Sequence, residues 1–172
     1  LKLDFKDFFS SIDRGILLKR LSKNFKGKEQ RVLFRFVKAS IENKIEAEAD
    51  FYGTFGHLKL RTTGIPQGLS YSPFLSSFYA LPLDKITNKI KGCKSFRYLD
   101  DMIVLSKNKR QANKVYELIK SRSEKLKLKL HPLEVGSKTQ LFDIDKNKFE
   151  FLGVGISKEN LFIPDDAVKE FK

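Results

Sequence analysis

Three aspartates have the residue type and the spacing for metal chemistry. Asp100 and Asp101 stand between two short apolar runs, 96–99 and 102–105, and Asp4 ends a strand-like segment at the start of the chain. Adjacent acids repel each other unless solvent or a cation neutralises them, and Asp is also a favoured turn residue. Taken alone, the pair is therefore typical of an ordinary surface turn.

Asp4 changes that interpretation if its strand pairs with a strand that flanks the acid pair. Three carboxylates would then converge, and their oxygen atoms are the ligands that Mg²⁺ prefers. Two such ions about 3.5–4 Å apart activate a hydroxyl nucleophile and stabilise the leaving oxygen in phosphoryl transfer. We therefore predict a site for two Mg²⁺ ions, with Mn²⁺ as a substitute. His57 and His131 lie in unrelated segments, and we expect both to be ordinary loop or strand histidines.

The net charge favours a polyanionic partner. The chain has 172 residues, with 34 Lys and Arg against 21 Asp and Glu, which gives a formal charge of +13. Such an excess is typical of proteins that bind nucleic acid. The alternative is a lysine-rich protein whose charges are only solvated, and composition alone leaves both interpretations open.

Cysteine content and hydropathy predict the compartment. A single cysteine, Cys93, cannot form an internal disulfide or a metal cluster, so we expect a small buried hydrophobe in a reducing compartment. No segment approaches the roughly 18 apolar residues of a membrane span, and no leader pattern is seen at the start. A cytoplasmic protein without a membrane partner is expected.

Hydrophobic periodicity and turn residues predict the order of elements. In chain order these are a strand at 1–6, a helix that starts after 11–13, a helix through 32–41, a hairpin at 50–63, a helix from 72 that is kinked or restarted at Pro82, a hairpin around 100–101, a helix at 112–126, and strands near 127–130, 139–143 and 148–156.

The spacing of apolar residues predicts which helix faces are buried. On the helix through 32–41 these are Val32, Leu33, Phe36, Val37 and Ile41, and on the helix from 72 they are Phe74, Leu75, Phe78 and Tyr79. The order of elements favours the α+β class, with an antiparallel sheet covered on one face by helices. A parallel doubly wound sheet fits this order less well.

Three segments resemble the palm motifs of bacterial reverse transcriptases, in the order found in that family. They are LDFKDFFSSI at 3–12, GIPQGLSYSP at 64–73 and FRYLDD at 96–101. Residues 128–139 resemble the fourth motif of the family, and residues 149–153 resemble its primer-grip hairpin. The resemblance covers nearly the whole chain and implies an RNA-directed DNA polymerase, a nucleotidyltransferase with a right-hand polymerase palm.

The resemblance implies roles for individual residues. Asp4, Asp100 and Asp101 would be the catalytic metal ligands, with the Phe5 backbone beside them. A second set would contact the nucleotide: Asp7 and Phe8 through their peptide amides, Phe9 as the ring that blocks a ribose 2′-hydroxyl, and Gln67, Gly68 and Lys138. A third set would contact the primer, namely Tyr98, Phe151, Leu152 and Gly153.

Plainer interpretations stand beside these roles. Phe9 is one of sixteen Phe and would also suit a core, Lys138 is one of many cations, and Tyr98 would also suit a packed hairpin. Residues 64–68 would also suit a simple Gly-Pro turn. At this point the sequence leaves each pair of interpretations open.

The resemblance also implies an organisation and a set of partners. Residues 1–163 would be a palm with lower-fingers helices and a hairpin inserted at about 14–62, and residues 164–172 would start a thumb or C-terminal helix. The chain lacks an initiating Met, so we expect upstream fingers strands and the rest of the thumb to lie outside it. The expected partners are an RNA or DNA template, a primer and deoxynucleoside triphosphates. An oligomer is left open.

The branch of the family is less well defined. The pattern at 64–76 and Ser77, where many retron and intron enzymes place Asn, favour the phage-defence and abortive-infection branches. Retron and group II intron enzymes remain alternatives, as does an untemplated DNA polymerase from the defence branch. A catalytically silent nucleic-acid-binding scaffold is a further alternative. A viral-type RNA-dependent RNA polymerase is disfavoured by Phe9 and by the Pro-Gln-Gly motif.

Overall fold

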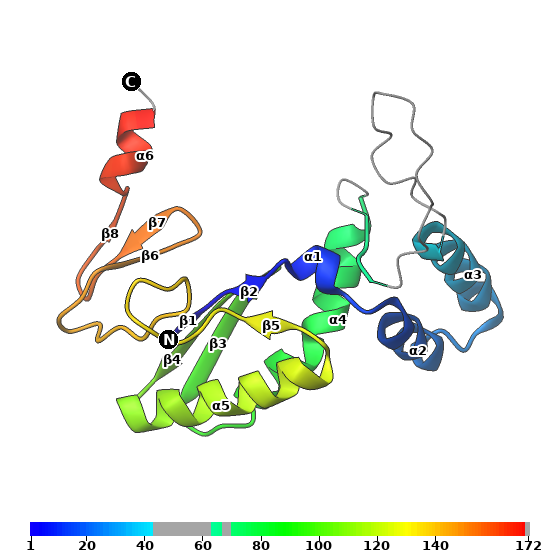
Figure 1. The fold of residues 1–172 in the computed structure, drawn as a ribbon, viewed down its shortest axis with the longest axis horizontal. Coiled ribbons are helices and arrows are strands. Elements are labelled where there is room, and N and C mark those ends of the chain that lie inside the picture. The colour runs from blue at the N-terminus through cyan, green and yellow to red at the C-terminus, as the bar shows by residue number, and fades with distance from the viewer. Residues whose placement is uncertain (43–62, 67–69, 171–172) are drawn as a thin grey trace. The chain divides into compact units, whose positions relative to one another are not determined.

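A computed structural model describes residues 1–42, 63–66 and 70–170 of the chain. These residues form two compact units, one made of residues 1–6 and 81–172 and the other of residues 7–80 (Figure 1). The described part of the insert expected at 14–62, residues 14–42, falls in the second unit. The hairpin expected at 50–63, apart from Thr63, lies outside the described residues, as does His57.

A three-stranded antiparallel sheet is the centre of the first unit. Its strands are β1 (Lys2–Leu3), β4 (Asp101–Ser106) and β3 (Cys93–Tyr98), in that order across the sheet. The β3–β4 hairpin is the one predicted around the acid pair, and its register runs from Cys93↔Ser106 to Tyr98↔Asp101. Met102, Ile103 and Val104 are all buried because β4 is the central strand. Cys93 is only half-buried, which corrects the expectation of a buried cysteine.

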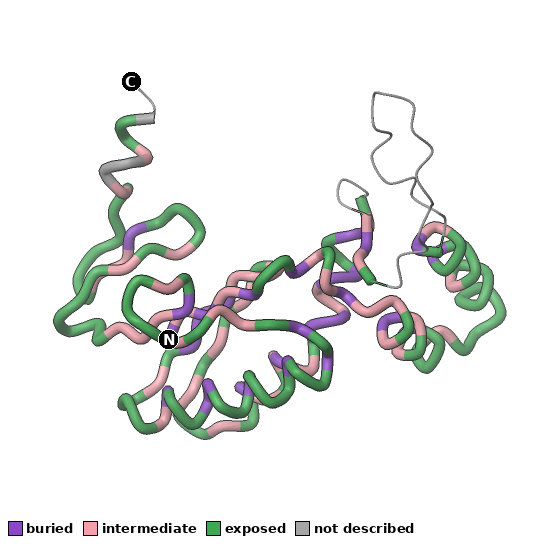
Figure 2. Tube along the Cα trace, in the orientation of Figure 1, coloured by how far each residue is buried: buried purple, intermediate pink, exposed green. Residues whose placement is uncertain are grey.

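Helix α5 (Lys109–Lys125) packs against β4 and confirms the helix predicted at 112–126. Asn108 caps the helix, since its side chain accepts a hydrogen bond of 2.9 Å from the Gln111 N–H. The buried residues recur at helical spacing along one face, and Figure 2 shows them as purple segments; they are Ala112, Val115, Tyr116, Ile119 and Ser123. Burial of this apolar stripe covers one side of the sheet.

Two smaller sheets complete the first unit. Strand β2 (Phe5–Lys6) pairs with β5 (Lys129–Leu130), and a separate sheet contains β6 (Phe149–Phe151), β7 (Val154–Ile156) and β8 (Leu161–Phe162). Helix α6 (Asp165–Glu170) follows. The strand predicted at 139–143 is wrong, because Gln140 forms only an isolated bridge with Lys2.

The second unit is helical. It contains α1 (Phe8–Ser11), α2 (Arg14–Asn24), α3 (Lys28–Glu42) and the first part of α4 (Ser72–Thr87). Val37 and Ile41 of α3 are buried, but Val32, Leu33 and Phe36 are exposed, contrary to the expectation. Val32 and Phe36 lie roughly 100° or more around the helix from Val37, so the stripe that buries Val37 does not include them. Leu33 lies four residues before Val37, and helical position does not explain its exposure.

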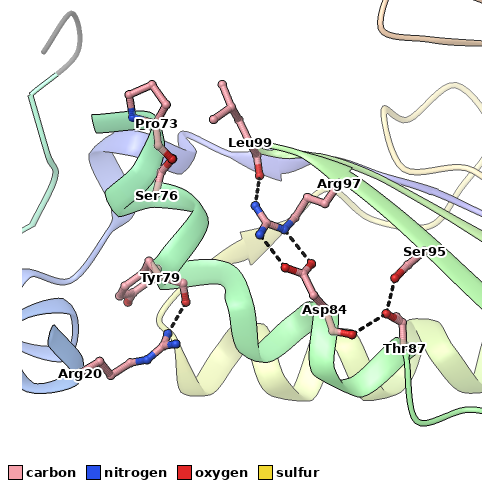
Figure 3. A network of polar contacts seen from close by, with 9 residues as sticks. All are labelled: Arg20, Pro73, Ser76, Tyr79, Asp84, Thr87, Ser95, Arg97 and Leu99. Carbon is pink, nitrogen blue, oxygen red and sulfur yellow. Dashed lines mark hydrogen bonds and ion pairs between the residues drawn. The ribbon is translucent and has the colours of Figure 1, made fainter. Parts of the chain in front are cut away.

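Helix α4 runs through Pro82 as one continuous helix, so it is not restarted there. Proline removes one helical hydrogen bond, and in the same turn the Tyr79 carbonyl accepts a hydrogen bond from the Arg20 guanidinium (Figure 3). Leu75 and Tyr79 are buried as predicted, Phe74 is exposed, and Phe78 is half-buried. Within the residues that the structure describes, no helix has both the length and the apolar character to cross a bilayer.

The start of α2 is set by Asp13, as the sequence predicts. The Asp13 carboxylate accepts a hydrogen bond of 2.8 Å from the Ile16 N–H and so caps the helix. Asp13→Ala leaves this donor without its partner, and we expect the free energy of unfolding to fall by about 1 kcal/mol. Urea denaturation checks this value. Asp13→Asn, which keeps an acceptor at this position, should change the stability by much less.

Candidate polymerase active site

Strand pairing brings the three predicted aspartates to one end of the central sheet. Asp100 lies in the β3–β4 turn, Asp101 begins β4, and Asp4 lies between β1 and β2. Leu3 pairs with Met102 in antiparallel register, so one further step along both strands sets Asp4 opposite Asp101. The pairing on which the metal-site prediction depends is therefore present.

Asp4 is fixed by His131 and Thr139, two residues to which the sequence assigned no role in the site. Its N–H donates to Thr139 Oγ1 at 3.1 Å, and its carbonyl accepts from the His131 N–H at 3.0 Å. The side chains of His131 and Asp4 also meet, with Nε2 and Oδ1 3.3 Å apart. His131 therefore contacts Asp4 through both its backbone and its side chain.

The sequence held a signal for this contact. His131 directly follows β5, and β5 pairs with β2 so that Leu130 lies opposite Phe5. The same antiparallel register sets His131 opposite Asp4. A resemblance in the segment 128–139 was visible in the sequence, but the pairing of β5 with β2 was not.

The electrostatics of the site indicate accumulated negative charge. The pKa of Asp101 is raised above its ordinary value, mainly by burial and then by the charge of Asp100, with Asp4 adding to the effect. Lys2 and Lys138 act in the opposite direction. A raised pKa means that the ionised carboxylate is disfavoured where it stands, and a bound cation would relieve that cost.

The carboxylates do not by themselves complete a metal cage. In the ranges that the structure describes, no group of three or more His, Cys, Asp or Glu side chains is placed to hold an ion. The donor set nevertheless fits Mg²⁺, because carboxylate oxygens predominate and Mg²⁺ commonly uses one or two carboxylates, with water and substrate phosphates as its other ligands.

Backbone hydrogen bonds in the second unit join the first and second motifs. The Gly64 N–H donates to the Ile12 carbonyl at 2.7 Å, and the Ile65 N–H donates to the Phe9 carbonyl at 3.1 Å. Arg14 Nε donates to the Gly64 carbonyl at 2.7 Å. Phe9 is thereby held beside the segment that leads to Gln67. Gln67 and Gly68 themselves lie outside the described residues.

Phe9 and its neighbours occupy the short helix α1. Phe8 is buried, whereas Phe9 is half-exposed, and their rings meet edge to face with centroids 5.7 Å apart. Asp7 adopts a left-handed backbone conformation at φ 46° just before the helix. Phe8 therefore supports the ring of Phe9, which keeps one side accessible to solvent.

Gly64 meets a strict steric requirement. Its φ of +84° is costly for other residues, and a Cβ atom there would lie 3.2 Å from the Ser10 carbonyl oxygen. We expect Gly64→Ala to lower the stability by about 1–3 kcal/mol, measured by chemical denaturation. Gly136→Ala is the matched control, because its φ is +82° but no atom lies within 4 Å of the added Cβ. Equal losses in the two variants would mean that the contact with Ser10 contributes nothing.

The predicted primer-side residues lie on hairpin turns of the first unit. Tyr98 is 61% exposed and pairs with Asp101 across the β3–β4 ladder. Phe151 pairs with Val154, and the two residues between them, Leu152 and Gly153, have φ values of 53° and 75°. Positive φ at both positions is typical of a tight type I′ hairpin turn. The structure thus contains the short hairpin predicted at 149–153.

Lys138 is the remaining predicted contact. It is exposed and favours the ionised form of Asp101. The structure therefore places a cation within electrostatic range of the aspartates. Its contact with a nucleotide remains a prediction.

Comparisons with solved structures identify the fold. The chain is similar to apo telomerase from Candida tropicalis, with a TM-score of 0.63 and 16% identity over 94% of this chain and 31% of that one. A form of the same telomerase truncated from its C-terminal domain gives a TM-score of 0.62 and 17% identity, over 95% of this chain and 35% of that one. This chain thus spans about a third of the length of these structures. No curated protein matches it in sequence.

The comparison with protein families agrees with the motifs. The family described as reverse transcriptase (RNA-dependent DNA polymerase) matches residues 1–156 of the 172. Together with the structural likeness, this confirms the α+β palm fold that the motifs implied. The match includes the three aspartates, the segment 64–73 and the hairpin at 149–153. The chain belongs to the reverse transcriptase family.

Proposed function

We propose that the protein containing this chain adds deoxynucleotides to the 3′-hydroxyl of a primer, with Asp4, Asp100 and Asp101 as ligands for two Mg²⁺ ions. The observation that carries the proposal is the pairing of β1 with β4, which sets Asp4 opposite Asp101 in a member of the reverse transcriptase family. The raised pKa of Asp101 supports it, because this site is one that a cation would stabilise.

The proposed mechanism assigns separate tasks to the residues of the chain. Bound Mg²⁺ would lower the pKa of the primer hydroxyl and stabilise the leaving pyrophosphate. The aspartates supply the oxygen ligands, together with the backbone of Phe5. His131 and Thr139 hold Asp4 in place. Lys138 would stabilise negative charge on the triphosphate.

The nucleotide and primer sites are proposed from the family motifs. Phe9 would pack against C2′ of the sugar, where a flat ring leaves no volume for a hydroxyl. The peptide amides of Asp7 and Phe8, with Gln67 and Gly68, would contact the rest of the nucleotide. The groups that would support the primer end are Tyr98, Phe151, Leu152 and Gly153.

The biological context is proposed from the sequence pattern alone. The segment 64–76 and Ser77 favour a bacterial enzyme of the phage-defence or abortive-infection branch, with a cytoplasmic location. Retron and intron enzymes are its nearest alternatives. The catalytically silent scaffold is disfavoured, because a silent descendant has no use for three acids whose charges oppose one another.

Primer extension by the full-length protein tests the proposed function. The reactions contain deoxynucleotides, Mg²⁺ or Mn²⁺, a primer, and an RNA template, a DNA template or none. Extension that requires Asp100 and Asp101 supports the metal site, and the template arms identify what is copied. Glu159→Gln is the matched control, because it removes one exposed negative charge from the connection between β7 and β8. Full activity of Asp100→Ala and Asp101→Ala would contradict the assignment.

Binding of nucleic acid should depend steeply on salt. The charge of +13 predicts that several phosphates are neutralised when a primer–template duplex binds. Counterion release then lowers affinity by at least about tenfold between 50 and 200 mM salt. Fluorescence anisotropy with a labelled duplex measures the slope. A flat response would rule out the electrostatic mode of binding.

A further inference from the structure

The turn that carries the acid pair has an unfavourable backbone conformation. Leu99, directly before Asp100, has a φ of 54°, in the left-handed region that residues with a Cβ rarely adopt. Such a conformation persists only where the surrounding structure holds it. The residues that hold Leu99 therefore also influence where Asp100 and Asp101 point.

Arg97 is the residue that contacts this turn. Its Nη1 donates to the Leu99 carbonyl at 2.9 Å, two residues further along the chain (Figure 3). The Arg97 side chain is only 7% exposed, so water competes little for this donor. The contact ties the strained residue to the body of strand β3.

Asp84 of helix α4 fixes the guanidinium of Arg97. Arg97 Nε lies 2.9 Å from one carboxylate oxygen of Asp84, and Nη2 lies 2.7 Å from the other. This fork uses two nitrogen atoms and leaves Nη1 directed at Leu99. Lysine has a single nitrogen and cannot bind a carboxylate in this bidentate way.

Helix α4 is itself anchored beside the strand. One helical turn beyond Asp84, the buried Thr87 hydroxyl is hydrogen-bonded to the Ser95 hydroxyl of β3 and donates to the Asp84 carbonyl at 2.9 Å. Leu83 is also fully buried. Asp84 thus projects from a helix that is held by packing and by a second polar contact, as a positioning element requires.

We propose that the Asp84–Arg97 pair positions the catalytic hairpin by holding the Leu99 carbonyl and so directing Asp100 and Asp101 toward the metals. The proposal rests on the proposed function, which makes those aspartates the metal ligands. Arg97 is a positioning residue in this scheme and touches no substrate. The competing explanation is a half-buried ion pair that contributes to stability alone.

Four variants of the full-length protein separate the two explanations, and Arg110→Met, on the exposed start of α5, is the matched control. Arg97→Met removes every donor, and Arg97→Lys keeps a charge for Asp84 but removes the fork. Asp84→Asn removes the charge that fixes Arg97. The fourth variant combines Arg97→Met with Asp84→Asn.

We expect kcat to fall about 10- to 100-fold in Arg97→Met and in Arg97→Lys, while the Kd for primer–template stays within about twofold. Mn²⁺ binding to the protein without nucleotide, followed by electron paramagnetic resonance, should weaken by at least about threefold. Hydrogen exchange should accelerate at residues 98–101 and stay unchanged at β7. The double variant should be no slower than Arg97→Met, because both substitutions break one unit.

The proposal is overturned if Arg97→Lys, or any folded Arg97→Met protein, keeps the kcat and Mn²⁺ affinity of the wild type. A lowered melting temperature with unchanged kcat would support the purely structural explanation instead. Asp101→Asn is run in the same series. If Asp101→Asn is inactive while the Arg97 variants are fully active, only the positioning proposal fails. If Asp101→Asn is fully active, the metal assignment fails, and the positioning proposal fails with it.

Discussion

Asp101→Asn should reduce primer extension by the full-length protein by about a thousandfold or more. A metal ion that stabilises the charges of phosphoryl transfer contributes several kcal/mol, and each 1.36 kcal/mol corresponds to a factor of ten in rate. Asn has nearly the same shape as Asp but lacks the charge that would bind the ion. Single-nucleotide incorporation under pre-steady-state conditions measures the loss, and Glu159→Gln should be as fast as the wild type.

The same substitution should make the metal-free protein more stable at neutral pH. The pKa of Asp101 is raised in the folded state, so its ionised form costs stability once the pH exceeds the unfolded-state value of about 3.9. The side chain is partly exposed, and solvent screening keeps the effect modest. Thermal denaturation in EDTA should show a higher melting temperature for Asp101→Asn at pH 7, with the advantage declining as the pH falls toward 4.

Mg²⁺ provides the complementary measurement. A cation that binds only the folded state raises its melting temperature in proportion to the logarithm of ligand concentration. The wild type should therefore be stabilised by Mg²⁺, and Asp101→Asn should respond much less. A variant that is less stable than the wild type in EDTA at pH 7, or one that keeps the full response to Mg²⁺, would contradict the assignment of Asp101.

The sequence correctly predicted those elements in which the pattern of apolar and capping residues matches the burial seen in the structure. The hairpin at 100–101 has apolar strands on both sides, and α5 has a cap residue and one continuous apolar stripe, so pattern and structure coincide. Helix α1 has only four residues, too few for periodicity to be visible. At Pro82 the expected restart did not occur, because one missing hydrogen bond does not by itself end a helix of 16 residues.

The candidate site was predictable where its residues share a motif and unpredictable where tertiary pairing assembles it. Asp4, Asp100 and Asp101 are the residue type that a Mg²⁺ site would use, and each lies in a motif visible in the sequence. The contact between His131 and Asp4 depends on the register of β5 with β2, two strands of two residues each, and no local pattern sets such a register. The interaction of Arg97 with Leu99 similarly depends on a φ angle that sequence does not display.

Phe9→Ala should weaken discrimination against ribonucleotides by roughly 10- to 200-fold, the range that removal of steric exclusion in a pocket typically gives. The ring of Phe9 is half-exposed, supported from one side by Phe8, and its carbonyl is fixed by the Ile65 N–H. Removing the ring opens space for a 2′-hydroxyl without removing any group that binds the deoxynucleotide. The ratio of kcat/KM for each deoxynucleotide and its ribonucleotide measures the change.

Two neighbouring variants make this prediction specific. Phe9→Tyr keeps the flat ring and should keep the sugar preference. Phe8→Ala removes a buried ring and should lower stability by about 3–5 kcal/mol, with a smaller effect on the preference than Phe9→Ala. If Phe9→Ala left the preference unchanged while the protein stayed folded, Phe9 would be a packing residue and the selection of deoxynucleotides would lie elsewhere. The sugar preference therefore reports on one side chain, whereas loss of the whole reaction reports on the aspartates.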